Sequence, residues 1–175
     1  MLKINFKMKK LLFLLAILLF ISCEKPTHFS EKALNDTVIS LDDSSSTFKE
    51  VINQYKGKKI VIDVWASWCA DCIRGLPKVK ELQEEFPEVV FLFLSVDEKN
   101  DAWKKGIKRF NILGEHYNLP KGMKNGDFVD FVNLNWIPRY IVVDENGTIS
   151  LFKATKATDK NIEKALKMRI FAAEN

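Results

Sequence analysis

Two cysteines are the residues of this chain whose type and spacing point most directly to chemistry. Cys69 and Cys72 stand three positions apart, at the end of the apolar stretch 61–65 and the start of a helical pattern. Cysteines at this spacing can close a small disulfide loop, and a helix N-terminus favours the thiolate over the thiol. The pair therefore predicts thiol–disulfide exchange.

The cysteines lie between two segments that have the pattern of buried strands. The run 59–65 is almost entirely apolar and is interrupted by Asp63, which indicates a strand covered on both faces of a sheet. After the cysteines, apolar residues recur every three or four positions up to Phe86, so an amphipathic helix is expected. Segment 89–96 is a second buried strand. This arrangement places the cysteines at the carboxyl end of the first strand, where α/β sheets place their sites.

The rest of the chain predicts shorter elements around this unit. Asn146-Gly147 between two apolar segments predicts a β-hairpin over 140–152. We also expect strands near 37–41 and 116–119, and helices near 48–55, 103–110, 128–132 and from about 159 onward. Together these elements predict one α/β domain.

Asp63 is the charged residue of the first buried strand. An unpaired carboxylate among its apolar neighbours would be costly. We expect burial to raise the pKa of this carboxyl group, which suits a group that accepts or donates a proton. The alternative is a solvated aspartate at the edge of the sheet.

The segment 65–72, Trp-Ala-Ser-Trp-Cys-Ala-Asp-Cys, resembles the active-site motif of the thioredoxin superfamily. The resemblance is closest to the membrane-anchored TlpA/ResA-type branch and spans about residues 37–171. It is supported by Asp63 six residues before the first cysteine, Pro77 eight after it, and Ile137-Pro138 ahead of the hairpin. It implies an α/β, thioredoxin-like fold with a central mixed β-sheet flanked by helices, and an insert, 111–135, before the cis-proline hairpin.

The resemblance also implies roles for individual residues. Cys69 would be the exposed nucleophile that attacks a substrate disulfide, and the more buried Cys72 would resolve the mixed disulfide. Asp63 would move the Cys72 proton. Pro138 would be cis, and the backbone of Ile137 would pair with an extended substrate segment; a trans turn proline is the alternative. No cofactor is implied besides the redox-active disulfide Cys69–Cys72, and no metal.

Two residues of the motif are expected to shape how the site reacts. Trp68 would be exposed and would form part of a flat docking surface for substrate, while Trp65 would be buried. Asp71 stands where thioredoxin has proline and puts a negative charge near both sulfurs. It should stabilise the helix through its dipole and raise the pKa values of the cysteines, which favours a reductant.

The N-terminus has the pattern of an export signal. Lys9 and Lys10 precede the apolar run 11–21, which is too short to cross a bilayer as a helix. The segment 19–23 resembles the lipobox of bacterial lipoproteins, which implies lipidation of Cys23. We therefore expect a signal peptide over 1–22, a lipid-anchored tether over 23–36 and a thioredoxin-like domain over 37–175.

The charge balance argues against nucleic-acid binding. The chain has 27 Lys and Arg residues against 23 Asp and Glu, and four of the lysines belong to the expected signal peptide. The mature chain would carry 23 of each sign, so its basic excess disappears.

These observations predict an extracytoplasmic thiol–disulfide oxidoreductase that reduces protein disulfides through its CxxC motif, for example in cytochrome c maturation. The resemblance implies protein clients, a membrane thiol reductant of the DsbD/CcdA kind, and a lipid anchor to a bacterial membrane facing the periplasm. A thiol peroxidase and a non-catalytic thioredoxin-like binding domain are the alternatives. A zinc module is disfavoured because structural zinc needs four ligands and the sequence has no second cysteine or histidine pair.

Overall fold

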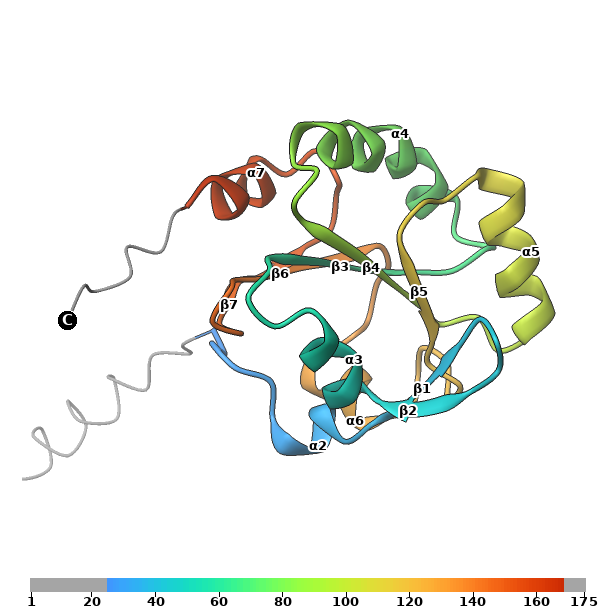
Figure 1. Cartoon of the computed structure of the whole chain (residues 1–175). Coiled ribbons are helices and arrows are strands. Elements are labelled where there is room, and N and C mark those ends of the chain that lie inside the picture. The colour runs from blue at the N-terminus through green and yellow to red at the C-terminus, as the bar shows by residue number, and fades with distance from the viewer. Residues whose placement is uncertain (1–24, 169–175) are drawn as a thin grey trace, which may run out of the picture.

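A computed structural model describes residues 25–168, which form a seven-stranded mixed sheet with helices on both faces (Figure 1). The strand order is β2-β1-β5-β4-β3-β6-β7. The strands are β1 (Thr37–Ser40), β2 (Ser45–Thr47), β3 (Ile60–Trp65), β4 (Val90–Ser95), β5 (Glu115–Asn118), β6 (Arg139–Val143) and β7 (Ile149–Ala154). The helices are α2 (Glu31–Leu34), α3 (Phe48–Gln54), α4 (Ala70–Glu85), α5 (Asn100–Phe110), α6 (Asp127–Phe131) and α7 (Lys160–Lys167).

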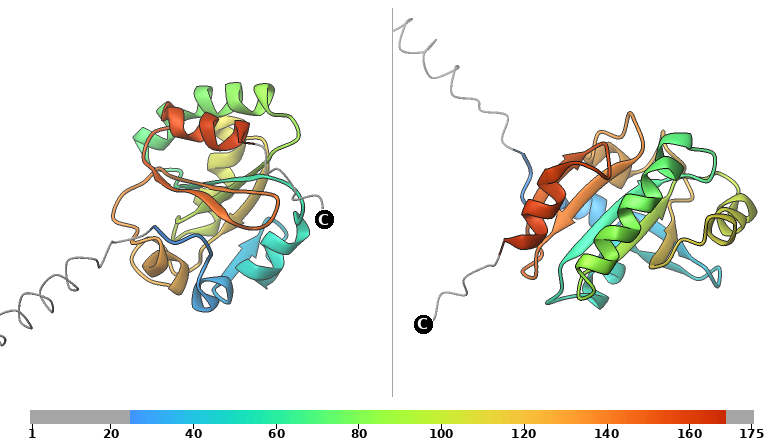
Figure 2. Two further views of the ribbon diagram at one scale, coloured as in Figure 1. Left: turned by 90° about the vertical axis from the view of Figure 1, so that its left-hand side faces the viewer. Right: turned by 90° about the horizontal axis from the view of Figure 1, so that it is seen from above.

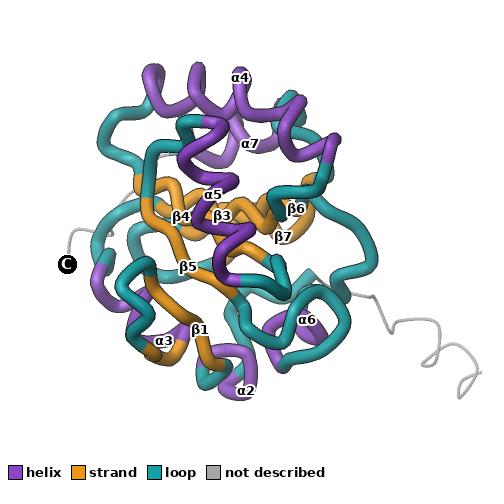
Figure 3. The backbone as a smooth tube through the Cα atoms, turned by 90° about the vertical axis from the view of Figure 1, so that its right-hand side faces the viewer, coloured by secondary structure: helices purple, strands orange, loops and turns teal. Residues whose placement is uncertain are grey.

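Five of the six described helices form two layers, one on each face of the sheet. Helices α4 and α7 cover one face of the sheet, and α2, α3 and α6 cover the other (Figures 1 and 3). Figure 2 shows α4 and α7 side by side, and Lys78 of α4 joins Glu163 of α7 in an ion pair of 3.0 Å. The central strands are therefore shielded from water on both sides.

The centre of the sheet is the part that the apolar pattern predicts. Strand β3 is buried along its whole length and lies between β4, which runs parallel to it, and β6, which runs antiparallel. In this register Asp63 is opposite Phe93 on one side and Tyr140 on the other. The mixed sheet and the strand, helix, strand unit around the cysteines are confirmed.

The expected insert, 111–135, is built into the sheet. It contains β5, which pairs with β4 in parallel and with β1 in antiparallel fashion. It also contains α6, whose Phe128 is fully buried. The carboxylate of Asp36, directly before β1, accepts hydrogen bonds from the Phe128 amide at 2.9 Å and from Lys121 Nζ at 2.8 Å. These bonds hold the insert next to the start of β1.

Residues 27–36, which we expected to belong to a tether, pack on the domain. The carbonyl of Thr27 accepts a hydrogen bond of 2.7 Å from the Ile149 amide, and Ala33 in α2 is fully buried. Phe29 is 9% exposed, with its ring centroid 5.0 Å from that of Phe48 and 5.5 Å from that of Phe131. Polar composition hid this packing, because a single aromatic residue gives no periodic signal. The folded domain therefore begins at about Thr27 rather than at residue 37.

Two predictions concern the start of the chain, before residue 25. The predicted signal peptide, 1–22, and the lipidation site Cys23 lie outside the part that the structure describes. Within residues 25–168, no helix has both the length and the apolar character needed to cross a membrane.

Phe29→Ala should lower the free energy of unfolding by about 3 kcal/mol, because it empties an aromatic site in the core. Urea denaturation measures this change. Leu41→Ala removes a side chain that is 47% exposed and is the matched control, with an expected effect below about 0.5 kcal/mol. Equal effects of the two substitutions would mean that the N-terminal segment does not pack on the domain.

Candidate active site

The two cysteines lie where β3 passes into α4. Cys69 is the N-cap residue of α4, and its sulfur forms a disulfide with Cys72, with 5.3 Å between the Cα atoms. The backbone amide of Cys72 donates a hydrogen bond of 3.1 Å to Cys69 Sγ. After reduction this amide and the helix N-terminus would stabilise a thiolate on Cys69. This geometry supports Cys69 as the candidate nucleophile of the pair.

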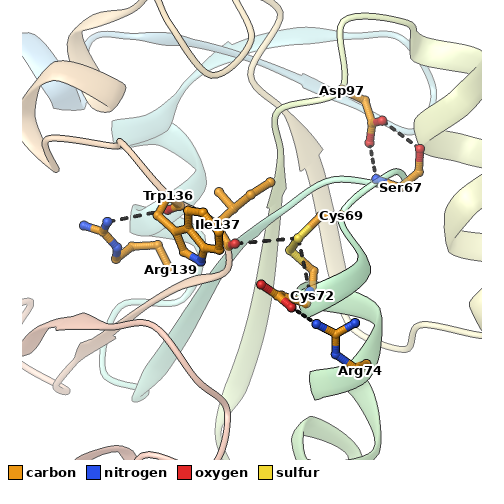
Figure 4. The surroundings of a disulfide bond; sticks show 9 residues. Ser67, Cys69, Cys72, Arg74, Asp97, Trp136, Ile137 and Arg139 are labelled. Carbon is orange, nitrogen blue, oxygen red and sulfur yellow. Dashed lines mark hydrogen bonds and ion pairs between the residues drawn. A yellow bond between two sulfur atoms is a disulfide. The ribbon is translucent and has the colours of Figure 1, made fainter.

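The loop before Cys69 is held by a buried carboxylate at the end of β4 (Figure 4). Asp97 accepts hydrogen bonds from the Ser67 amide at 2.8 Å and from the Ser67 hydroxyl at 2.7 Å. The Ser95 hydroxyl donates a third, at 2.8 Å, and Asn118 binds the Asp97 carbonyl at 2.9 Å. The sequence analysis missed Asp97, because only the pairing of β3 with β4 brings it to the motif.

The proline loop faces the disulfide from the opposite side (Figure 4). The Ile137–Pro138 peptide bond is cis, as expected from the resemblance. The carbonyl oxygen of Ile137 lies 3.7 Å from Cys69 Sγ, within reach of the proton of a reduced thiol. Cys69 and the segment that the family resemblance added, 68 residues away in the sequence, therefore meet at one sulfur.

A buried arginine, Arg139, forms hydrogen bonds with the segment that leads to Pro138. Arg139 donates hydrogen bonds to the Val132 carbonyl at 3.2 Å, to Asn135 Oδ1 at 3.1 Å and to the Trp136 carbonyl at 3.5 Å. Burial lowers the pKa of the guanidinium from its usual value. Arg139 was also missed, because a basic residue at the start of a strand carries no sequence signal for burial.

Asp63 lies in the core, which excludes a solvated edge position. Burial raises the pKa of Asp63 to about 8, and the nearby Tyr140 hydroxyl partly opposes that rise. A carboxyl group with this pKa exchanges its proton near neutral pH, as a general acid or base must. The residue has the environment that its expected role requires.

An aromatic surface surrounds the sulfur of Cys69. Trp68 is 61% exposed and Trp136 is 56% exposed, whereas Trp65 is buried, as expected for the two motif tryptophans. A shallow hollow between them is lined by Trp68, Cys69, Ala70, Asp71, Met123, Asn135, Trp136 and Ile137. Cys69 itself is only 6% exposed, so the expectation of an openly exposed nucleophile is wrong. The part of Cys69 that remains accessible lines this hollow.

The charge of Asp71 has a partner that the sequence analysis did not consider. Arg74, one helical turn later, forms an ion pair with Asp71 at the protein surface. Opposite charges three positions apart on a helix are neighbours, so this pair was readable from the spacing. The guanidinium offsets part of the negative charge beside the sulfurs.

The buried histidine of the described residues, His116, packs in the core of the protein. His116 Nε2 lies 3.1 Å from the Ile112 carbonyl, and its ring stacks on Phe93 with 5.2 Å between centroids. Burial lowers the pKa of His116. Over residues 25–168 no cluster of three or more His, Cys, Asp or Glu side chains has a geometry that would hold a metal ion.

A reactive disulfide at a helix N-terminus, a cis-proline beside it and a buried carboxyl group on the central strand define a thiol–disulfide oxidoreductase of thioredoxin type. A family model described as thioredoxin-like matches residues 56–149, and the chain belongs to this family.

Individual relatives agree with that assignment. The thiol-disulfide oxidoreductase ResA of Bacillus cereus is 24% identical over 151 residues, which cover 85% of this chain and 82% of that protein. The thioredoxin-like protein YneN of Bacillus subtilis is 28% identical over 144 residues, or 79% of this chain and 74% of its own length.

Solved structures share the fold. The thioredoxin domain of a thiol-disulfide oxidoreductase from Bacteroides vulgatus superimposes with a TM-score of 0.65 at 23% identity, covering 82% of this chain and 99% of that one. A DsbE-type thiol:disulfide interchange protein from Chlorobium tepidum gives a TM-score of 0.63 at 18% identity, covering 81% and 98%. At these identities the likeness establishes the fold.

Asp63→Asn should remove a defined part of the pH dependence of stability. The folded protein keeps a proton on Asp63 up to about pH 8, whereas the unfolded chain releases it near pH 3.8. Between these values the folded state binds more protons, so the free energy of unfolding falls as pH rises, by about 1.4 kcal/mol per pH unit. The substitution abolishes this fall.

Urea denaturation of oxidised wild type and Asp63→Asn between about pH 5 and pH 8 measures the difference. The variant should gain stability relative to wild type as the pH rises. Two curves that stay parallel over this range would contradict a protonated Asp63 in the folded state.

Proposed function

We propose that this protein is an exported, lipid-anchored reductase of protein disulfides. The observation that carries the proposal is the position of Cys69 Sγ in the hollow, where it receives the Cys72 amide at 3.1 Å and lies 3.7 Å from the Ile137 carbonyl. An extended client segment that pairs with the backbone of Ile137 would bring its own disulfide to this sulfur. The anchor and the export signal rest on the sequence of residues 1–23.

The reaction proceeds by two exchanges of sulfur partners. The Cys69 thiolate attacks one sulfur of the client disulfide, a mixed disulfide forms, and the other client sulfur leaves as a thiolate. Cys72 then gives its proton to the Asp63 carboxylate and attacks Cys69 Sγ. The Cys69–Cys72 disulfide forms and the second client thiolate leaves. Two electrons have passed from the cysteine pair to the client.

The aromatic surface would select the client. Trp68, Trp136 and the partly buried Met123 place apolar area beside the reactive sulfur. Tryptophan and methionine are suited to binding varied apolar side chains. We therefore expect clients whose disulfide cysteine is flanked by apolar or aromatic residues, for which the cysteine-containing apocytochrome c is one candidate class.

The electron source would be a second membrane protein. A thiol of the DsbD/CcdA kind would attack the Cys69–Cys72 disulfide and return the pair to its reduced form, with the same surface in use. This partner is the one that the family resemblance implies.

Replacing Cys72 with serine should trap clients, because the mixed disulfide on Cys69 then lacks the thiol that resolves it. Expression of the exported Cys72→Ser variant, acid quenching and non-reducing electrophoresis should show adducts that dithiothreitol releases. Cys69→Ser keeps the other cysteine and is the matched control, which should yield none. Absence of adducts, together with absence of dithiol-dependent reduction of a test protein disulfide, would contradict the proposal.

The same trap tests the client surface. In the Cys72→Ser background, Trp136→Ala and Met123→Ala should lower the yield of protein adducts by about fivefold to tenfold. The rate with a small disulfide reagent should stay unchanged. Leu113→Ala removes an exposed apolar residue away from the hollow and is the control. Equal loss for all three variants would assign no selective role to the surface.

The direction of electron flow is tested by the reduction potential. A reductant should have a potential near that of thioredoxin, about −270 mV, and far from the strongly oxidising value of about −120 mV. Asp71→Asn removes a negative charge beside the sulfurs and should make the potential less negative, whereas Arg74→Ala should make it more negative. Equilibration with glutathione measures all three proteins. A wild-type potential near −120 mV would contradict the reductive direction.

A further inference from the structure

Two buried polar groups lie opposite each other beneath the active site. The antiparallel register of β3 and β6 pairs Asp63 with Tyr140, so both side chains project from the same face of the sheet. Both residues are almost fully buried. Among the described residues, neither Asp63 Oδ1 nor the Tyr140 hydroxyl has a hydrogen-bond partner of good geometry. Buried polar atoms are usually paired, so two adjacent unpaired ones call for a reason.

The face on which they meet is covered by the helix of the cysteines. A Cβ atom added at Gly75 of α4 would lie 3.2 Å from the Tyr140 hydroxyl oxygen. Gly75 follows Cys72 by three positions, so both lie on one side of α4. The side of α4 that carries the resolving cysteine therefore lies over the Asp63–Tyr140 pair, and the missing side chain of Gly75 leaves room for the hydroxyl.

Tyr140 is the polar side chain that affects the pKa of Asp63. On β4 the residue opposite Asp63 is Phe93, which carries no titratable group. The two cysteines at the start of α4 are joined in the disulfide and carry no titratable proton in this state. Burial is the main cause that raises the pKa of Asp63, and the Tyr140 hydroxyl is the group that lowers it.

We propose that Tyr140 is a positioning residue for the proton transfer that resolves the mixed disulfide. Its hydroxyl donates a hydrogen bond to the Asp63 carboxylate when Cys72 is about to lose its proton, and turns to accept one once Asp63 is protonated. A phenolic hydroxyl can do both because it is a donor and an acceptor and its hydrogen can turn about the C–O bond. This inference rests on the proposed proton transfer between Cys72 and Asp63.

The chemistry of tyrosine suits this position. Burial and the charge of Asp63 raise the pKa of Tyr140 above its ordinary value, so the phenol keeps its proton at any pH at which the protein works. It therefore supplies a hydrogen bond to the charged form of Asp63 without adding a charge to the core. The thiol proton passes to Asp63 and no net proton passes to Tyr140.

The test is Tyr140→Phe, which removes only the hydroxyl oxygen. Loss of a hydrogen bond to the carboxylate should raise the Asp63 pKa by about one unit, so about tenfold less Asp63 is ionised at neutral pH. The carboxyl carbon of Asp63, followed by NMR titration of the oxidised protein, reports this pKa. The rate of reduction of a small test disulfide should fall about tenfold at neutral pH, and its pH profile should move upward by about one unit.

Tyr117→Phe is the matched control, because it removes the hydroxyl of another buried tyrosine, on β5, two strands away from β3. It should leave the Asp63 pKa and the pH profile unchanged. In Asp63→Asn, adding Tyr140→Phe should change the profile no further. An unchanged Asp63 pKa in a folded Tyr140→Phe protein would overturn the inference, whatever its melting temperature.

The wild-type protein supplies a second measurement that needs no substitution. The NMR signal of the Tyr140 ring carbon that bears the hydroxyl should shift at the Asp63 pKa, because the hydrogen bond changes direction there. A signal that stays constant across that pH range would also overturn the inference. Neither NMR measurement involves a client, so failure of client trapping and failure of this inference are separate results.

Discussion

The site depends on one sulfur being held at the first turn of a helix. Cys69 Sγ receives the Cys72 amide at 3.1 Å, and this contact exists only while α4 begins at Ala70, directly after β3 ends. Ser67 bound to Asp97 fixes the loop that joins them, and Gly106 allows α5 to approach that loop, since a Cβ there would lie 2.6 Å from Ser67 Cβ. The reactivity of the cysteine therefore depends on the ends of two central strands.

Three buried ionisable groups lie in the strands and loops that build this site, and their hydrogen bonding differs. Asp97 receives several hydrogen bonds and holds the loop before the motif. Arg139 donates to the loop 132–136 and holds the proline side of the site. Asp63 has no partner of good geometry on Oδ1 and has a raised pKa. Arg139 keeps its charge although its buried Nε has no hydrogen-bond partner among the described residues, whereas a buried carboxyl group without a partner can take up a proton and become neutral.

The packing of the N-terminal segment changes how an anchored form of the protein would sit. With a tether up to residue 36, the domain could stand about 40 Å from a lipid on Cys23; with the domain beginning at Thr27, four residues reach about 14 Å. An anchored domain would therefore stay close to the membrane surface. In the proposed anchored form, such a position would suit exchange with the proposed membrane thiol reductant and would restrict clients to those that come near the bilayer.

The sequence by itself determined the class of chemistry and the central unit of the fold. The spacing of Cys69 and Cys72, the apolar run around Asp63 and the helical pattern after it are local signals, because each depends on residues within a few turns of one another. The resemblance added Ile137 and Pro138, and the structure brings them to Cys69 as expected. Only tertiary structure decided which residues support and cover the site. Asp97, Arg139, Met123, Trp136 and Tyr140 reach it through strand pairing and loop packing between distant segments, and a polar or aromatic residue in isolation carries no sign of that pairing. For the same reason Phe29, alone in a polar segment, concealed that the domain begins before β1.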